Sequence, residues 1–166
     1  MSSSRIILVA EDSPADTLLL KRAFSRAGIG LRILFLDDGE KIIEYLKQTR
    51  TAGSNVDGSP ALIMVDLAMP RVGGLEVLTW VRQQLDLSHL PVIVFSGLNR
   101  PIDISRAYAR GADLFLIKTS DPNQWVTVLR RLAEIYGLSN RSEGVELPSS
   151  DARTSASLLR DDNLAA

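Results

Sequence analysis

Cysteine is absent from all 166 residues of this chain. Disulfides, thiol nucleophiles, zinc–thiolate sites and iron–sulfur clusters are therefore excluded. An excess of basic residues is absent too, because 19 Lys and Arg residues stand against 20 Asp and Glu residues. Proteins that neutralise nucleic-acid phosphates usually carry such an excess. We therefore expect no nucleic-acid partner.

Long apolar runs are also absent. The apolar segments have the length of strands, far below the ~20 residues that cross a membrane. The amino-terminal MSSSRIILVAED has a short apolar stretch followed at once by acids, unlike a secretory signal. We therefore expect a cytoplasmic protein with no membrane partner.

Strand-like and helix-like segments alternate along the chain. Short apolar segments predict strands at 6–10, 31–36, 61–66, 91–96 and 114–118. Amphipathic segments predict helices at 14–27, 39–50, 75–85, 101–111 and 123–136. Strands that are apolar throughout favour a parallel sheet with helices on both faces. The predicted fold class is thus a doubly wound α/β domain.

Composition changes near the carboxyl terminus and before the third predicted strand. Residues 1–138 are predicted to form one domain, since 166 residues suffice for one core but are short for two. Residues 139–166 are mostly small or charged, which predicts a disordered tail. The segment TAGSNVDGSP, residues 51–60, is rich in turn formers and is predicted to be a loop.

Polar side chains follow several of the predicted strands. Glu11 and Asp12 come after the first strand, and Asp66 ends the third. Ser96 ends the fourth strand and Lys118 the fifth. Because ligands of doubly wound folds bind at the carboxyl ends of the strands, we expect these side chains to lie at one edge of the sheet.

The chemistry of these groups points to phosphoryl transfer. Three neighbouring carboxylates repel one another and favour a bound cation, and Mg²⁺ prefers oxygen ligands. A lysine ammonium and a serine hydroxyl suit phosphoryl oxygens. A carboxylate that the metal does not consume can act as a nucleophile and form an aspartyl phosphate. An acid such as Asp66 at the end of a strand is by itself more often a turn or cap residue; the combination favours chemistry.

Four motifs in this order and spacing carry a resemblance: EDSPAD, MVDLAMPRVGG, VFSG and GADLFLIK. Over about Arg5 to Tyr136 the chain resembles the receiver domain of two-component response regulators. The stretch from EDSPAD through LLLKRAF, together with the long loop before the third strand, resembles the stand-alone receivers associated with phytochromes. The resemblance implies a flavodoxin-like sheet of five parallel strands in the order 2-1-3-4-5, with five helices.

The resemblance also implies a role for each residue at this edge of the sheet. Asp66 matches the phosphoacceptor. The implied Mg²⁺ ligands are Glu11, Asp12, Asp66 and the main-chain carbonyl of Ala68. The phosphate-pairing lysine, the switch hydroxyl and the aromatic switch are Lys118, Ser96 and Phe115. On phosphorylation, Ser96 would move towards the phosphoryl group and Phe115 would turn inward.

One position departs from the receiver pattern. Thr119 stands where receivers usually have Pro, often after a cis peptide bond. Because a cis bond before any other residue costs roughly 2.5–4 kcal/mol, we expect a trans bond and a slightly displaced Lys118. The inventory of groups at the site is unaffected.

The resemblance implies a signalling protein that is not an enzyme. It would receive a phosphoryl group from a sensor histidine kinase or a histidine phosphotransfer protein. Its output would be a changed surface formed by helix 101–111, strand 114–118 and helix 123–136. The apolar stripe that begins at Trp125 in the last helix would allow a homodimer through this surface.

Two other classes of function stay open on the residues alone. A phosphatase of the haloacid-dehalogenase type also uses an aspartate at a strand end with Mg²⁺, but its second aspartate would stand at Ala68. A receiver-like binding module that accepts no phosphate is compatible with Thr119. A nucleotide-binding protein is least favoured, because neither GxGxxG nor GxxxxGK[ST] follows any predicted strand.

Overall fold

The computed structural model describes residues 4–51 and 58–138. Its sheet has five parallel strands in the order β2-β1-β3-β4-β5. The strands are β1 (Arg5–Ala10), β2 (Arg32–Leu36), β3 (Ser59–Asp66), β4 (Val92–Ser96) and β5 (Leu114–Ile117). The predicted flavodoxin-like fold and its strand order are thus confirmed. The predicted tail, residues 139–166, lies outside the described residues, and the domain boundary at residue 138 stays a prediction.

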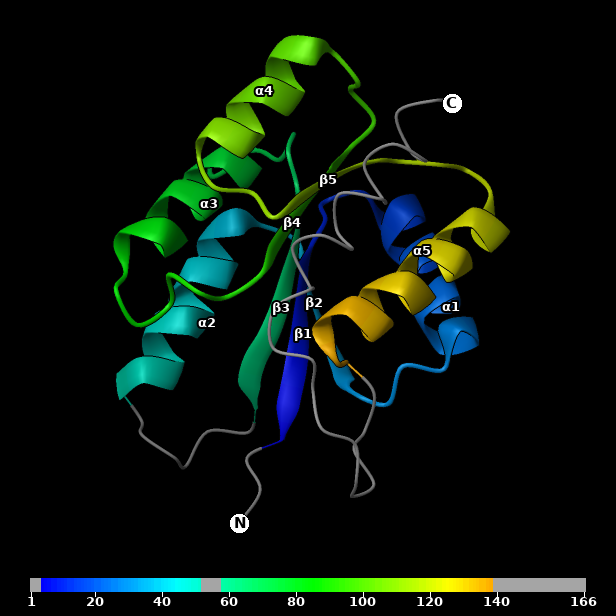
Figure 1. The fold of residues 1–166 in the computed structure, drawn as a ribbon, viewed down its shortest axis with the longest axis horizontal. Coiled ribbons are helices and arrows are strands. Elements are labelled where there is room, and N and C mark those ends of the chain that lie inside the picture. Colours follow the sequence, from blue (N-terminus) through cyan, green and yellow to red (C-terminus); the bar gives the residue numbers. More distant parts are fainter. Residues whose placement is uncertain (1–3, 52–57, 139–166) are drawn as a thin grey trace.

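Helices cover both faces of the sheet (Figure 1). They are α1 (Pro14–Ala27), α2 (Gly39–Thr51), α3 (Gly74–Gln83), α4 (Pro101–Ala109) and α5 (Pro122–Tyr136). α1 and α5 pack on one face, and α2, α3 and α4 on the other, which gives one apolar core on each side. In the described part of the chain, no helix is long and apolar enough to cross a membrane.

β3 begins earlier than its sequence suggests. Ser59 and Pro60 belong to this strand, although both fall in the segment predicted to be a loop. Pro60 pairs with Ile6, and the register with β1 shifts immediately afterwards. A proline cannot donate to the ladder, so it is tolerated at the start of a strand or beside such an irregularity. The first two residues of β3 are of types that are common in turns, which is why the sequence predicted a loop there.

The apolar stripe of α5 faces the protein interior. Trp125, Leu129 and Leu132 are each at most 2% exposed and belong to the core shared with α1. Burial of aromatic and aliphatic side chains is the main favourable contribution to folding. Because the stripe is buried within this chain, it does not support a homodimer. The homodimer stays a prediction.

The turn between β2 and α2 packs closely against the loop that follows β3. Asp38 is 1% exposed and forms an ion pair with Arg71, which has a left-handed backbone with φ 63°. Next to it, a Cβ at Gly39 would lie only 2.3 Å from the carbonyl oxygen of Val72 and 2.7 Å from Val77 Cγ2. These contacts hold the loop after Asp66 in place, and they require a residue without a side chain at position 39.

Gly39→Ala is expected to lower the free energy of unfolding by about 1–3 kcal/mol, because the added methyl group must displace main-chain atoms of the neighbouring loop. Gly97→Ala is the matched control, since a Cβ at Gly97 would meet no atom within 4 Å. Its expected change is below about 0.5 kcal/mol. Urea unfolding of the two variants measures the difference, and equal stabilities would contradict the close approach.

Candidate functional site

Asp66 ends β3 between the ends of β1 and β4. The residue is 3% exposed. Its Oδ1 accepts a hydrogen bond from the Ala68 main-chain N–H at 3.1 Å, and its Oδ2 accepts one from Lys118 Nζ at 2.7 Å. A buried carboxylate is costly unless it is paired, so the site is built to hold this charge.

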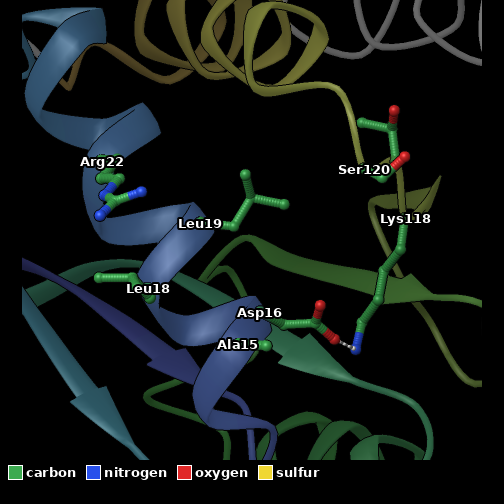
Figure 2. Close-up of a pocket in the computed structure, with 8 residues that line it drawn as sticks. Ala15, Asp16, Leu18, Leu19, Arg22, Lys118 and Ser120 are labelled. Carbon is green, nitrogen blue, oxygen red and sulfur yellow. Dashed lines mark hydrogen bonds and ion pairs between the residues drawn. The ribbon is translucent and has the colours of Figure 1, made fainter.

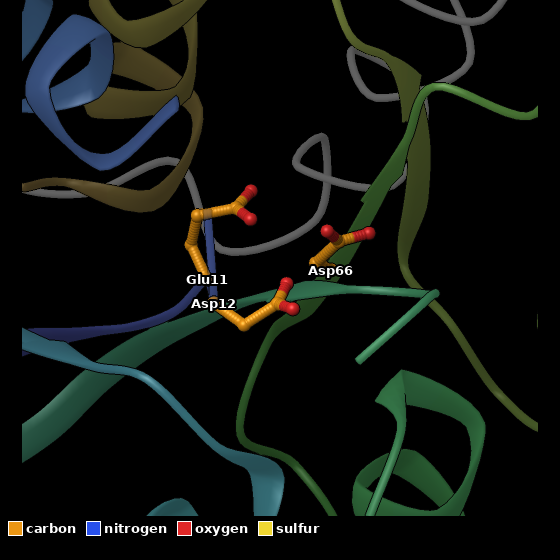
Figure 3. A group of neighbouring side chains, drawn as sticks. All are labelled: Glu11, Asp12 and Asp66. Carbon is orange, nitrogen blue, oxygen red and sulfur yellow. The ribbon is translucent and has the colours of Figure 1, made fainter. Parts of the chain in front are cut away.

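Two further acids join Asp66 at the carboxyl ends of the strands. Carboxylate oxygens of Glu11, Asp12 and Asp66 all lie within 4.8 Å of one another (Figure 3). Glu11 and Asp66 are buried, whereas Asp12 is exposed. The structure thus brings together the three acids that the sequence places at this edge of the sheet. Ala68, the fourth predicted ligand, lies two residues beyond Asp66 in an exposed part of the loop.

Lys118 lies directly after β5 and reaches across the strand ends. Its Nζ is 2.6 Å from Glu11 Oε2, 2.7 Å from Asp66 Oδ2 and 2.9 Å from Asp16 Oδ2. Burial by itself would lower the pKa of Lys118, but the close carboxylates of Asp66, Glu11 and Asp16 raise the pKa above its ordinary value. The lysine is therefore a permanent positive charge at the centre of the acids.

The loop after Lys118 keeps its place without a proline. The peptide bond between Lys118 and Thr119 is trans, as expected from the sequence. The Trp125 indole N–H donates to the Thr119 carbonyl oxygen at 2.9 Å, and the Trp125 ring packs edge-on against Phe95. Thr119 therefore does not prevent Lys118 from reaching Asp66.

Glu11 is a buried acid whose ionised form the site disfavours. Burial raises the pKa of Glu11 from its ordinary value of 4.5 to about 7, against the lowering effect of Lys118 and of the Ser13 N–H. Its Oε1 accepts from that N–H at 3.0 Å. Its Oε2 is buried and accepts no hydrogen bond, although it forms an ion pair with the Lys118 ammonium at 2.6 Å. A carboxylate oxygen of this kind suits a hard cation.

Ser96 and Phe115 occupy the last two strands of the sheet. Ser96 is fully buried, and its Oγ accepts from the Leu98 main-chain N–H at 3.0 Å. Phe115 is only 5% exposed, and its main-chain N–H donates to the Tyr108 hydroxyl at 3.0 Å. In this conformation Phe115 is already buried, and its role as a switch stays a prediction. A phenyl ring has no hydroxyl to keep hydrated, so burial is its favoured state.

Asp16 belongs to the site although the sequence did not indicate it. An acid in the first turn is typical of the start of a helix and does not indicate a site. The structure aims its carboxylate at Lys118 instead. The contact joins residues 102 positions apart, so local sequence signals could not reveal it.

Residues 7–130 match the family model described as the response regulator receiver domain. The chain belongs to this family. The family is one of signalling domains, and the acids and lysine described above occupy the positions that the sequence motifs indicated.

Curated relatives cover most of this receiver. It is 32% identical over 139 residues to the probable methanogenesis regulatory protein FilR2 of Methanothrix harundinacea (strain 6Ac). This match covers 84% of this chain and 88% of FilR2. It is 30% identical over 115 residues to response regulator Rcp1 of Synechocystis sp. (strain ATCC 27184 / PCC 6803 / Kazusa), covering 69% of this chain and 77% of Rcp1. The likeness therefore extends over most of the length of both relatives.

Solved structures of response regulators, among them a phytochrome response regulator, superpose on this receiver. Response regulator RPA3017, described as acting in red light signaling of R. palustris, has a TM-score of 0.72 at 31% identity, covering 88% of this chain and 99% of that one. The phosphorylated cyanobacterial phytochrome response regulator RcpA has a TM-score of 0.70 at 26% identity, with the same coverage. The Mn²⁺-bound form of Rcp1 has a TM-score of 0.67 at 26% identity, covering 85% and 99%. The predicted resemblance to phytochrome-associated receivers is confirmed.

The pH dependence of stability tests the environment of Glu11. The folded protein binds the Glu11 proton more tightly than the unfolded chain does, so the contribution of Glu11 to stability falls as the pH rises from 4.5 to about 7. From about pH 5 to pH 8, wild-type stability in chelator should fall by about 2–3 kcal/mol relative to Glu11→Gln. Urea unfolding of both proteins at several pH values measures this difference. Parallel pH profiles would show that Glu11 ionises normally.

Proposed function

We propose that this receiver accepts a phosphoryl group on Asp66 from the phosphohistidine of a sensor histidine kinase or a histidine phosphotransfer protein. The observation that carries the proposal is the meeting of a buried Asp66 with an acidic pair and a lysine ammonium at one edge of the sheet. Membership of the receiver family and the phosphorylated state of the similar RcpA support it. We place this reaction in the cytoplasm.

The reaction needs little from the protein beyond placement and charge. An Asp66 carboxylate oxygen attacks the phosphorus, and the phosphorus–nitrogen bond of phosphohistidine breaks. The electron pair returns to the imidazole nitrogen, and an acyl phosphate remains on Asp66. The Lys118 ammonium, already 2.7 Å from Asp66, then donates to a phosphoryl oxygen and offsets part of its charge.

The acids of the site fit a divalent cation, which we propose to be Mg²⁺. Its ligands would be Glu11, Asp12, Asp66 and the main-chain carbonyl of Ala68. The buried Glu11 Oε2 without a hydrogen-bond donor supports this fit, and the similar Rcp1 is described in a Mn²⁺-bound form. When bound, Mg²⁺ would neutralise negative charge on the phosphoryl oxygens.

The proposed output is a change in the surface formed by α4, β5 and α5. To donate to a phosphoryl oxygen, the Ser96 hydroxyl would move away from the Leu98 N–H that it now accepts from. The loop between β4 and α4 would lose this bond and shift. Leu98 is 44% exposed and Ile102 51%, so apolar side chains are available there for a protein partner.

Acetyl phosphate, a small phosphoryl donor, provides the test without the cognate kinase. With Mg²⁺, wild-type protein is expected to gain one phosphoryl group by intact mass spectrometry, since Asp66 is the nucleophile. Chelation of Mg²⁺ or the Asp66→Asn substitution should abolish the gain. No gain in the wild type, or an equal gain in the variant, would contradict the proposal. Turnover of a generic phosphate ester would instead favour a phosphatase.

A further inference from the structure

Asp16 projects from the first turn of α1 towards Lys118. Its Oδ2 lies 2.9 Å from the Lys118 Nζ (Figure 2). The Asp16 side chain is 39% exposed, whereas those of Glu11 and Asp66 are 0% and 5% exposed. The pair borders a hollow between α1 and the loop after β5, where Leu19 and Ser120 line the walls. Asp16 is therefore the partner of Lys118 that a molecule approaching from solvent meets.

The start of α1 leaves the Asp16 carboxylate free for this contact. In a capping box, the acid at the third helical position accepts from the main-chain N–H of the N-cap residue. Here the N-cap is Ser13, whose Oγ accepts from the Asp16 N–H at 3.3 Å. The Ser13 N–H donates to Glu11 Oε1 at 3.0 Å rather than to Asp16. Glu11 thus satisfies the helix terminus, and Asp16 reaches the lysine.

Asp16 is one of three carboxylates that surround the Lys118 ammonium. Oxygens of Glu11, Asp66 and Asp16 lie between 2.6 and 2.9 Å from its Nζ, and the ammonium donates hydrogen bonds to Asp66 and Asp16. Two of these, Glu11 and Asp66, belong to the acidic group that can hold a cation, but Asp16 does not. Neutralising that group therefore leaves Asp16 as a competitor for the lysine. A phosphoryl oxygen must then share Lys118 with a nearby negative charge.

We propose that Asp16 is a specificity-determining residue that weakens acceptance of phosphoryl donors and strengthens cation binding. This inference rests on the proposed phosphorylation of Asp66. The Asp16 carboxylate competes with the phosphoryl group for Lys118 and repels an anionic donor at the open side of the site. The same charge adds to the negative potential that attracts a divalent cation. Its effects on the two kinds of ligand therefore have opposite signs.

The Asp16→Asn variant isolates the charge, because asparagine keeps an oxygen that can accept from Lys118. Calorimetric titration is expected to show Mg²⁺ binding weakened by about three- to tenfold. At Mg²⁺ concentrations that saturate each protein, acetyl phosphate should label the variant faster by about three- to tenfold. In that reaction a phosphorus–oxygen bond breaks and acetate leaves with the electron pair. Glu134→Gln removes the same charge from an exposed position of α5 and should match the wild type.

A residue that only holds Lys118 or the helix in place would not shift the two ligands in opposite directions. Labelling at or below the wild-type rate, or unchanged Mg²⁺ affinity, would overturn the inference. If the wild type accepts no phosphoryl group at all, the proposed function fails, and the cation titration alone decides the role of Asp16. Weaker Mg²⁺ binding in the variant would then support the charge effect, and equal binding would refute it.

Discussion

The ammonium of Lys118 is the charge on which this site depends. It lies within 2.9 Å of carboxylates from three different elements, β3, α1 and the turn that follows β1. Without it, buried Glu11 and Asp66 would face each other with no nearby counter-charge, which is strongly unfavourable at low dielectric. The site also contains one oxygen, Glu11 Oε2, that the lysine leaves without a hydrogen bond. In our account, the lysine stabilises the acids in the absence of a cation and a phosphoryl group. It leaves the acids when a cation binds and donates to the phosphoryl group.

The parallel sheet explains how these groups meet. Strands β1, β3 and β4 are apolar and buried along most of their length, and polar residues begin at their common carboxyl edge. Close packing behind the site keeps that edge in place. Gly39 and the Asp38–Arg71 ion pair hold the loop after Asp66, and Trp125 holds the loop after Lys118. The ionised Glu11 carboxylate lowers the stability of the folded protein, because its burial disfavours the charge.

Local signals predicted the alternation of strands and helices and most members of the site, and the family resemblance implied the strand order. Apolar runs that end in Asp66 and Lys118 place these residues at the same edge in any parallel sheet. The contact of Asp16 depended on the tertiary structure and could not be read locally, because Asp16 reaches Lys118 across the fold. The role of each site residue in phosphoryl transfer stays a prediction.

Magnesium binding to the Lys118→Met variant tests the central claim most directly. If Lys118 occupies the acids until a cation replaces it, removing the ammonium while keeping an unbranched side chain should free Glu11 and Asp66. Calorimetric titration above the pKa of Glu11 is then expected to show Mg²⁺ bound about tenfold more tightly than by the wild type. Unchanged or weaker Mg²⁺ binding by a folded variant would contradict the account, because the lysine would not be competing for the carboxylates.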